Sequence, residues 1–200
     1  MRAVLYVHGY GGGADEARAY EDVFDCPVIG VGYTDFRPWA ARETVRRGCR
    51  ALAARFDGVG LLAVSIGAYF SMLALSDLPV ERAFFVSPLV DPEGLILRWM
   101  AEQGVTEAAL REKGTIPNRF GEPFSWEYLS YVRAHPLRWR APTEILCADR
   151  DGMTPPETMR AFAAAHGAGL TVIGAEHYIR PERVVPFLRE KLKTGGRADV

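Results

Sequence analysis

The chain has 200 residues and a formal net charge of −1 at pH 7. This length suits one domain, or one domain with an insertion, that can bury a core without a disulfide or a metal. The near-neutral charge gives no reason to expect a nucleic acid or an anionic membrane as a partner. Arg138 and Arg140, on either side of Trp139, come nearest to a basic patch, and we interpret them as a solvent-exposed face.

The three cysteines, Cys26, Cys49 and Cys147, are odd in number and widely spaced. They form no disulfide or metal-binding pattern, so we expect reduced thiols. No apolar run reaches the length of a membrane span, and the first one, residues 3–7, is too short for a secretory signal. We therefore expect a cytoplasmic protein. The sequence carries no indication of an oligomeric state.

Short apolar segments alternate along most of the chain with segments of helical periodicity. Strands are expected at residues 3–7, 27–31, 60–64, 82–86, 143–147 and 170–173. Helices are expected at residues 14–20, 38–56, 65–76 and 181–192, and after Thr154-Pro155-Pro156-Glu157, which has the pattern of a capping box. This alternation predicts an α/β fold, a three-layer sandwich in which helices cover both faces of a six-stranded, mainly parallel sheet.

The interval between Pro88 and Pro142 breaks the alternation. It has no strand signal, but it contains helix starts at Asp91, Thr106 and Ser125. A structureless loop of this length is uncommon in a compact domain. We therefore predict a helical cap, residues 88–141, inserted after the fourth strand of a core made of residues 1–87 and 142–193. Residues 194–200 are expected to form a flexible tail.

The segment 60–70 has the pattern of an apolar strand that ends at Ser65 and turns directly into a helix. Ala63 and Gly67, two positions before and after the serine, are small, as a tight strand-to-helix turn requires. The hydroxyl of Ser65 would lie near the start of the helix, where the dipole favours negative charge. The alternative is a serine that only caps a helix. Taken by itself, the segment does not separate the two.

A serine nucleophile needs a base, and the histidines can be compared for that role. His166 comes at the end of a helix, His135 precedes a proline, and His8 begins a glycine-rich loop. His177 differs because it follows the last expected strand on a short loop. Since open α/β sheets carry their sites at the carboxyl ends of strands, we predict His177 as the base.

The acid that orients the base should follow the fifth strand. Asp151 precedes Gly152 in a turn that leads to a helix, and we favour it. Asp149 is closer to the strand and can instead pair with Arg150 or face solvent, so it stays as an alternative. Asp91, after the fourth strand, is better explained as a helix cap because a proline follows it.

Two backbone N–H groups are candidates for stabilising an oxyanion. One belongs to Ile66, directly after the serine, and the other to Tyr10, in the glycine-rich loop 8–13. The loop follows the first strand, which should lie beside the third. A phosphate-binding loop is the alternative, but neither Gly-x-Gly-x-x-Gly nor Gly-Lys-Ser/Thr is present.

Taken together, these residues resemble the α/β hydrolases. The resemblance rests on His8-Gly9-Tyr10-Gly11-Gly12, Ala63-Val64-Ser65-Ile66-Gly67, Asp151 and His177, in the order Ser, Asp, His. It covers nearly all of the chain outside the predicted cap. It implies a strand order of 2-1-3-4-5-6 without the family's first two antiparallel strands. It also implies a two-step acyl transfer without a cofactor or metal, in which Ser65 attacks, His177 takes and returns the proton and Asp151 holds the imidazolium. Ala63 departs from the family's glycine.

We therefore predict a serine hydrolase, most simply a carboxylesterase acting on a small-molecule ester with a short or medium acyl or an aryl group. Thioesterase, lipase-like, amidase and acyltransferase activities on the same residues are alternatives, as is a non-catalytic ligand-binding protein. Aromatic residues of the predicted cap either line an apolar pocket over Ser65 or pack the cap. They are Trp99, Phe120, Phe124, Trp126, Tyr128, Tyr131 and Trp139.

Overall fold

A computed structural model describes residues 1–195 of the chain. Residues 196–200, most of the predicted tail, lie outside the described residues. The chain divides into two compact units: a core unit, Met1–Val90 with Arg138–Val200, and a helical unit, Asp91–Leu137. Within the described part of the chain, no helix combines the length and the apolar character needed to cross a membrane.

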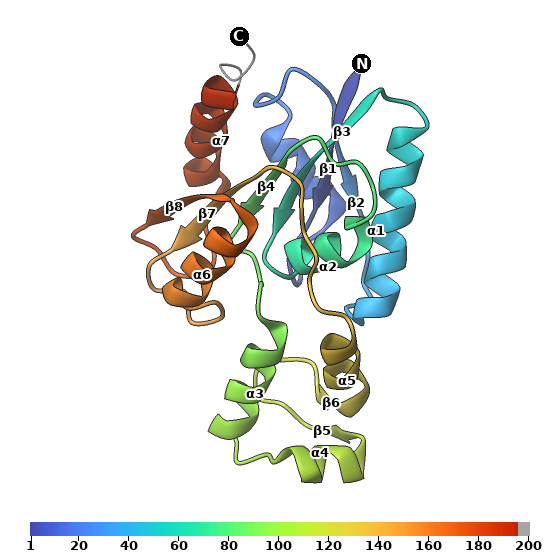
Figure 1. Ribbon diagram of the computed structural model, residues 1–200, viewed down its shortest axis with the longest axis vertical. Coiled ribbons are helices and arrows are strands. Elements are labelled where there is room, and N and C mark those ends of the chain that lie inside the picture. Colours follow the sequence, from blue (N-terminus) through green and yellow to red (C-terminus); the bar gives the residue numbers. More distant parts are fainter. Residues whose placement is uncertain (196–200) are drawn as a thin grey trace. The chain divides into compact units, whose positions relative to one another are not determined.

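The core unit is built on a six-stranded sheet whose neighbouring strands are all parallel (Figure 1). Its strands are β1 (Arg2–Val7), β2 (Val28–Val31), β3 (Gly58–Val64), β4 (Ala83–Val86), β7 (Thr143–Ala148) and β8 (Gly169–Ile173). They lie in the order β2-β1-β3-β4-β7-β8, which confirms the predicted order. Because β1 pairs with both β2 and β3, the chain reverses direction across the sheet at β1. Ligand sites of open α/β sheets lie at such a reversal.

Helices cover both faces of this sheet. They are η1 (Ala14–Tyr20), α1 (Pro38–Ala53), α2 (Ile66–Leu75), α6 (Pro156–His166) and α7 (Pro181–Gly195). Right-handed crossovers put α1, α2 and α6 on one face, since all three connections run in the same direction across the sheet, α1 from β2 past β1 to β3 and the other two between neighbouring strands. On the opposite face, strand residues such as Tyr6 and Phe84 share one apolar cluster with residues of η1 and α7. The predicted three-layer fold is confirmed.

The start of helix α6 differs from the sequence-based expectation. The helix begins at Pro156, and Pro155 at the N-cap supplies no side-chain hydrogen bond. The Thr154 hydroxyl instead donates to the carbonyl of Pro88 at 3.1 Å. The capping box was therefore the wrong interpretation, because the threonine hydroxyl forms a buried hydrogen bond with the segment after β4 instead of with the start of the helix. The predicted helix at residues 14–20 is a 3₁₀ helix.

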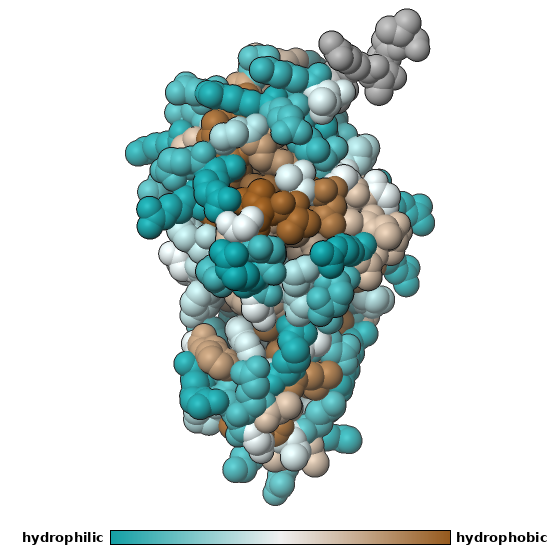
Figure 2. Space-filling view, turned by 90° about the vertical axis from the view of Figure 1, so that its left-hand side faces the viewer, coloured by the Kyte–Doolittle hydropathy of each residue, from teal (hydrophilic) through white to brown (hydrophobic). Residues whose placement is uncertain are grey.

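Strand β8 is an edge of the sheet, and its side chains are less buried than those of the central strands. Val172 is 41% exposed, and Leu170 and Ile173 are half-buried. Figure 2 faces the side of the core unit that carries α7 and β8, and hydrophobic surface gathers there at the height of β8. The apolar character that identified this strand in the sequence therefore does not correspond to full burial.

The helical unit contains α3 (Pro92–Glu102), α4 (Glu107–Lys113) and α5 (Trp126–Ala134). Each begins at a predicted capping residue: Asp91, Thr106 and Ser125 accept a hydrogen bond from a backbone N–H of the helix that follows. Met100, Leu110, Phe124 and Leu129 form its buried cluster. A short antiparallel pair, β5 (Thr115–Ile116) and β6 (Phe124–Ser125), was not predicted, since two residues per strand are too few to show an alternating pattern.

Candidate active site

Ser65 lies on a sharp turn between β3 and α2. Its backbone angles, φ 52° and ψ −123°, are unfavourable for a residue with a side chain. The turn is held from both sides, because the N–H of Ser65 donates to the carbonyl of Val86 at 2.9 Å and its carbonyl accepts from Leu89 N–H at 3.1 Å. The strained turn points to more than a helix cap, and no side-chain capping bond is formed by Ser65.

Small residues beside Ser65 allow this turn to pack against the end of β1. A Cβ atom added to Gly67 would lie 2.3 Å from the carbonyl oxygen of His8 and 2.6 Å from that of Val7. Two backbone oxygens this close leave no space for any side chain. Ala63 is fully buried in β3, where its methyl group fits without disturbing the register with its neighbours. Alanine therefore replaces the family's glycine without distorting the sheet.

Three predicted side chains meet above this turn. Ser65 Oγ lies 2.8 Å from Nε2 of His177, and Nδ1 of His177 lies 2.8 Å from Oδ2 of Asp151. A carboxylate can only accept, so Nδ1 carries the hydrogen and Nε2 is free to accept from the serine hydroxyl. The side chain of His177 is 22% exposed and that of Asp151 is fully buried. The imidazole can therefore exchange a proton with Ser65 while its other side is fixed.

The buried carboxylate of Asp151 is fully supplied with donors. Besides His177, it accepts the backbone N–H groups of Met153 at 2.8 Å and Thr154 at 3.0 Å, both through Oδ1. These bonds compensate the loss of water around the charge. Asp149 accepts from Ala175 N–H at 3.0 Å and pairs with the neighbouring Arg150. Asp151, and not Asp149, is therefore the carboxylate in hydrogen-bond contact with His177.

The glycine-rich loop lies directly beside the serine. A Cβ added to Gly9 would be 3.3 Å from Cβ of Ser65. Gly12 N–H donates to the Gly9 carbonyl at 3.2 Å, and Gly11 has φ 74°, the combination found in a type II turn. The N–H of Tyr10, in the middle of the turn, takes no part in this bond. Ile66 is the first residue of α2, where an N–H has no acceptor within the helix. Both predicted N–H groups therefore belong to backbone segments next to Ser65.

His8 stabilises this loop, and sequence reasoning did not identify its partner. Its ring is fully buried and stacks on Tyr33 with centroids 4.1 Å apart. Nδ1 of His8 lies 2.8 Å from the Gly9 carbonyl, while the hydroxyl of Tyr33 donates to the His8 carbonyl. The ring face toward Tyr33 and the Nδ1 atom are thus engaged in contacts that hold the loop. Tyr33 could have been suspected, since it follows the second strand at the same edge of the sheet.

The remaining histidines and the nearest thiol offer no competing chemistry. His166 lies with Nδ1 3.0 Å from the carbonyl of Trp139, and His135 with Nδ1 2.8 Å from that of Tyr131. Cys147 is buried in β7, and burial raises the pKa of its thiol to about 11. A thiol with this pKa stays protonated near neutral pH and is a poor nucleophile. Residues 1–195 contain no group of three or more His, Cys, Asp or Glu side chains suited to a metal ion.

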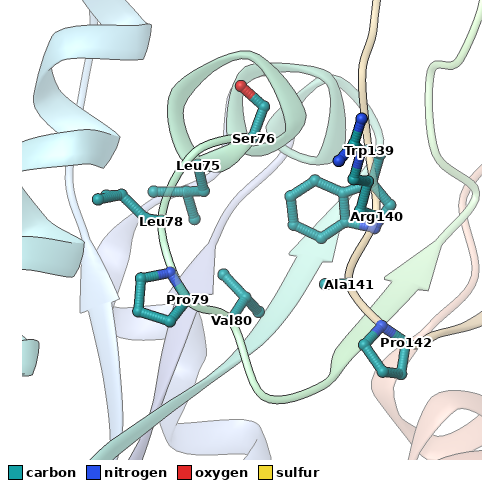
Figure 3. A pocket seen from close by; sticks show the side chains of 9 residues that line it. All are labelled: Leu75, Ser76, Leu78, Pro79, Val80, Trp139, Arg140, Ala141 and Pro142. Atoms are coloured by element: carbon teal, nitrogen blue, oxygen red, sulfur yellow. The ribbon is translucent and has the colours of Figure 1, made fainter.

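A pocket of about 210 Å³ lies elsewhere in the core unit. Figure 3 shows Leu75, Leu78 and Pro79 on one side of it and Trp139 on the other. These residues belong to the end of α2 with the segment that follows it, and to the segment entering β7, at the amino-terminal edge of the sheet. Ser65 lies at the carboxyl-terminal edge, so this pocket is not the site of the serine.

Two of the aromatic residues assigned to the predicted cap have a packing role. Trp139 belongs to the core unit, where it is 4% exposed and packs on Phe85 with centroids 5.6 Å apart. Its Nε1 donates to Thr143 Oγ1 at 2.7 Å. Phe124 is buried in the cluster of the helical unit. For these two side chains, packing is the correct interpretation.

No family model matches the chain, and no curated protein matches it in sequence. Solved structures do match. Est1E from Butyrivibrio proteoclasticus has a TM-score of 0.75 at 16% identity, over 96% of this chain and 87% of its own. Alpha/beta hydrolase domain-containing protein 10 from mouse has a TM-score of 0.70 at 13% identity, over 96% and 90%. MGS-MChE2, an alpha/beta hydrolase enzyme from the metagenome of sediments from the lagoon of Mar Chica, Morocco, has a TM-score of 0.66 at 18% identity, over 98% and 92%.

The chain therefore has the α/β-hydrolase fold, as the resemblance in its sequence implied. Its Ser65, His177 and Asp151 lie at the carboxyl-terminal edge of the sheet, after β3, β8 and β7. At this level of identity the likeness defines the fold, and the chemistry has to be argued from the side chains themselves.

Proposed function

We propose that the protein is a serine hydrolase, and specifically a carboxylesterase that cleaves esters with a short or medium acyl or an aryl group. The observation that carries the proposal is the continuous chain of hydrogen bonds from Ser65 Oγ through His177 to Asp151. A serine hydroxyl is a weak nucleophile, and a histidine within 2.8 Å that is itself fixed by a buried carboxylate is the arrangement that activates it.

In the first half of the reaction, Ser65 Oγ attacks the ester carbonyl carbon while its proton moves to Nε2 of His177. The Asp151 carboxylate stabilises the imidazolium that forms. The tetrahedral intermediate then breaks its bond to the alkoxy oxygen, which takes the proton from Nε2 and leaves as the alcohol. The acyl group stays on Ser65 as an ester.

In the second half, water attacks the acyl carbon and gives a proton to Nε2 of His177. Collapse of this intermediate breaks the bond to Ser65 Oγ, which recovers its proton, and the carboxylic acid leaves. The N–H groups of Tyr10 and Ile66 stabilise the negative oxygen in both intermediates. Removing one such donor typically costs about 10²–10³ in turnover.

The test is hydrolysis of p-nitrophenyl acetate and butyrate by the full chain. Ser65→Ala and His177→Ala should each lower kcat by about 10⁴-fold or more, because the nucleophile and base act as one unit. Ser76→Ala serves as a matched control, since Ser76 is an exposed serine just beyond the other end of α2. Equal activity in Ser65→Ala and the wild type would rule out the proposal.

A fluorophosphonate probe separates an enzyme from a binding protein with the same fold. The wild type and Ser76→Ala should be labelled, and Ser65→Ala should not. A panel of matched ester, thioester and amide substrates, with analysis of products in the presence of an added alcohol, then ranks the ester reaction against the alternatives on the same residues. A clear preference for thioesters or amides would correct the substrate class and leave the nucleophile unchanged.

A further inference from the structure

A pair of aromatic rings lies at the carboxyl-terminal edge of the sheet next to the glycine-rich loop. Tyr10 is 57% exposed, and its ring centroid is 4.6 Å from that of Phe36. Phe36 is half-buried and is anchored edge-on against Tyr33 at 5.5 Å. We call the rings of Tyr10 and Phe36 the aromatic platform. An exposed ring held against a half-buried ring is a preformed apolar surface.

The aromatic platform and the imidazole of His177 are on opposite sides of Ser65. Tyr10 follows β1 and Phe36 follows β2, and the strand order β2-β1-β3 puts both loops to one side of the serine. The loop reaches the serine itself, because a Cβ on Gly9 would lie 3.3 Å from Ser65 Cβ. His177 comes from the other direction, after β8 at the far edge of the sheet.

Under the proposed function, this arrangement determines on which side of Ser65 the alcohol part and the acyl part of an ester would lie. The proton on His177 Nε2 must be given to the oxygen of the leaving alcohol, so the alcohol lies on the β7–β8 side. With the carbonyl oxygen toward the N–H groups of Tyr10 and Ile66, the acyl group takes the remaining direction, away from His177 and over β1 and β2. We propose that the aromatic platform is the acyl-binding surface, and that it favours an apolar acyl chain or an aryl acid over an acetyl group.

The charged side chains near the platform are paired with each other, and this favours an acyl group without a charge. Arg37, the residue after Phe36, is the cation of this loop, and its guanidinium donates to Asp35 from Nε at 2.9 and 3.0 Å and also from Nη2. A carboxylate on the acyl group would have to compete with Asp35 for this guanidinium. An apolar acyl group needs no such exchange and gains contact with the rings.

The test uses two series of substrates, with the full chain in each case. In the acyl series, p-nitrophenyl butyrate and benzoate are compared with p-nitrophenyl acetate. In the alcohol series, butyl and benzyl acetate are compared with ethyl acetate. Tyr10→Ala and Phe36→Ala should lower the kcat/KM ratios of the acyl series by about tenfold, the effect of losing apolar contact in a substrate pocket. The ratios of the alcohol series should keep their wild-type values.

Two control variants sharpen the result. Tyr10→Phe, a conservative variant, keeps the ring and the backbone N–H and should recover the acyl-series ratios that Tyr10→Ala loses. Val172→Ala removes an exposed apolar side chain at the far edge strand and should also leave them unchanged. Labelling of Ser65 by the fluorophosphonate probe checks that each variant is folded.

The possible failures are distinguishable. Unchanged acyl ratios in both alanine variants, or equal changes in the two series, would overturn the acyl-binding role and leave the serine hydrolase intact. A wild type that neither hydrolyses any of these esters nor reacts with the probe would overturn the proposed function, and the acyl-binding role with it.

Discussion

Most of the buried polar side chains lie at the carboxyl-terminal edge of the sheet, whereas an ion pair at the amino-terminal edge is exposed to water. Six polar or charged residues are buried in the described chain, and four of them, His8, Ser87, Asp151 and Thr154, follow the carboxyl ends of strands. At the opposite edge Arg2 pairs with Glu81 at 2.9 Å, and both side chains are well exposed. Such exposed pairs contribute little to stability.

Backbone strain follows the same division. Within residues 1–195, Ser65 and Ser87 are the non-glycine residues with positive φ, at 52° and 42°. They follow the neighbouring strands β3 and β4, and the buried hydroxyl of Ser87 has no hydrogen-bond partner among the described residues. Strain and an unsatisfied polar group both cost stability. The rest of the sheet therefore stabilises an unfavourable edge, which is the edge that carries the candidate site.

The largest effect expected from this difference concerns two glycines, Gly58 at the start of strand β3 and Gly67 just beyond its end. Gly67→Ala should lower the free energy of unfolding by about 3 kcal/mol, because a methyl group there meets two backbone carbonyls that cannot move. Gly58→Ala, at the amino end of β3, meets only the carboxylate end of the Glu81 side chain, which can turn away. Urea unfolding of both variants measures the comparison. Similar losses at the two positions would contradict it.

A smaller effect is expected at Asp149, which connects the two loops that carry Asp151 and His177. Its carboxylate accepts Ala175 N–H, two residues before His177. Asp149→Ala should lower kcat by about tenfold with KM nearly unchanged, because the imidazole loses its fixed position. Asp149→Asn keeps an oxygen acceptor and should recover most of the rate.

Kinetics of the two Asp149 variants, with thermal unfolding to compare their stabilities, distinguish positioning from general stability. If the alanine variant matched the wild type, or if the asparagine variant were equally slow, Asp149 would have no positioning role. A loss of rate that followed the loss of thermal stability in both variants would point to folding alone.

The smallest effect is expected at an ion pair near the amino-terminal edge, in which the carboxylate side chain is exposed. Asp77 accepts two hydrogen bonds from Arg46, at 2.6 and 2.7 Å, which lower the pKa of its carboxyl to about 2. Because the folded-state pKa is below the unfolded value, the contribution is present above about pH 4 and is lost as the pH falls toward about 2. Asp77→Asn should lower the thermal midpoint slightly at neutral pH and match the wild type near pH 2. A difference that persisted there would show that the pair is not its cause.

Much of the site was predictable because the residue types and their order restrict the chemistry. The small residues around Ser65 indicated a tight turn, and the strand pattern placed Ser65 and His177 at one edge of a parallel sheet. Periodicity and capping residues also located the three helices of the helical unit. The two-residue strands β5 and β6 lie below the length at which a pattern can be recognised.

The sequence by itself determined which side chains could act as nucleophile and base, since strand ends are visible in the order of apolar and small residues. Only the tertiary structure shows which of Asp149 and Asp151 contacts His177, because both follow β7 and the contact depends on which loop the carboxylate reaches. The contacts of Tyr33 and Thr154 are also visible only in the tertiary structure, because they join segments far apart in the chain. Local sequence sets the direction of the backbone, while hydrogen bonds across loops depend on the folded arrangement of the whole sheet.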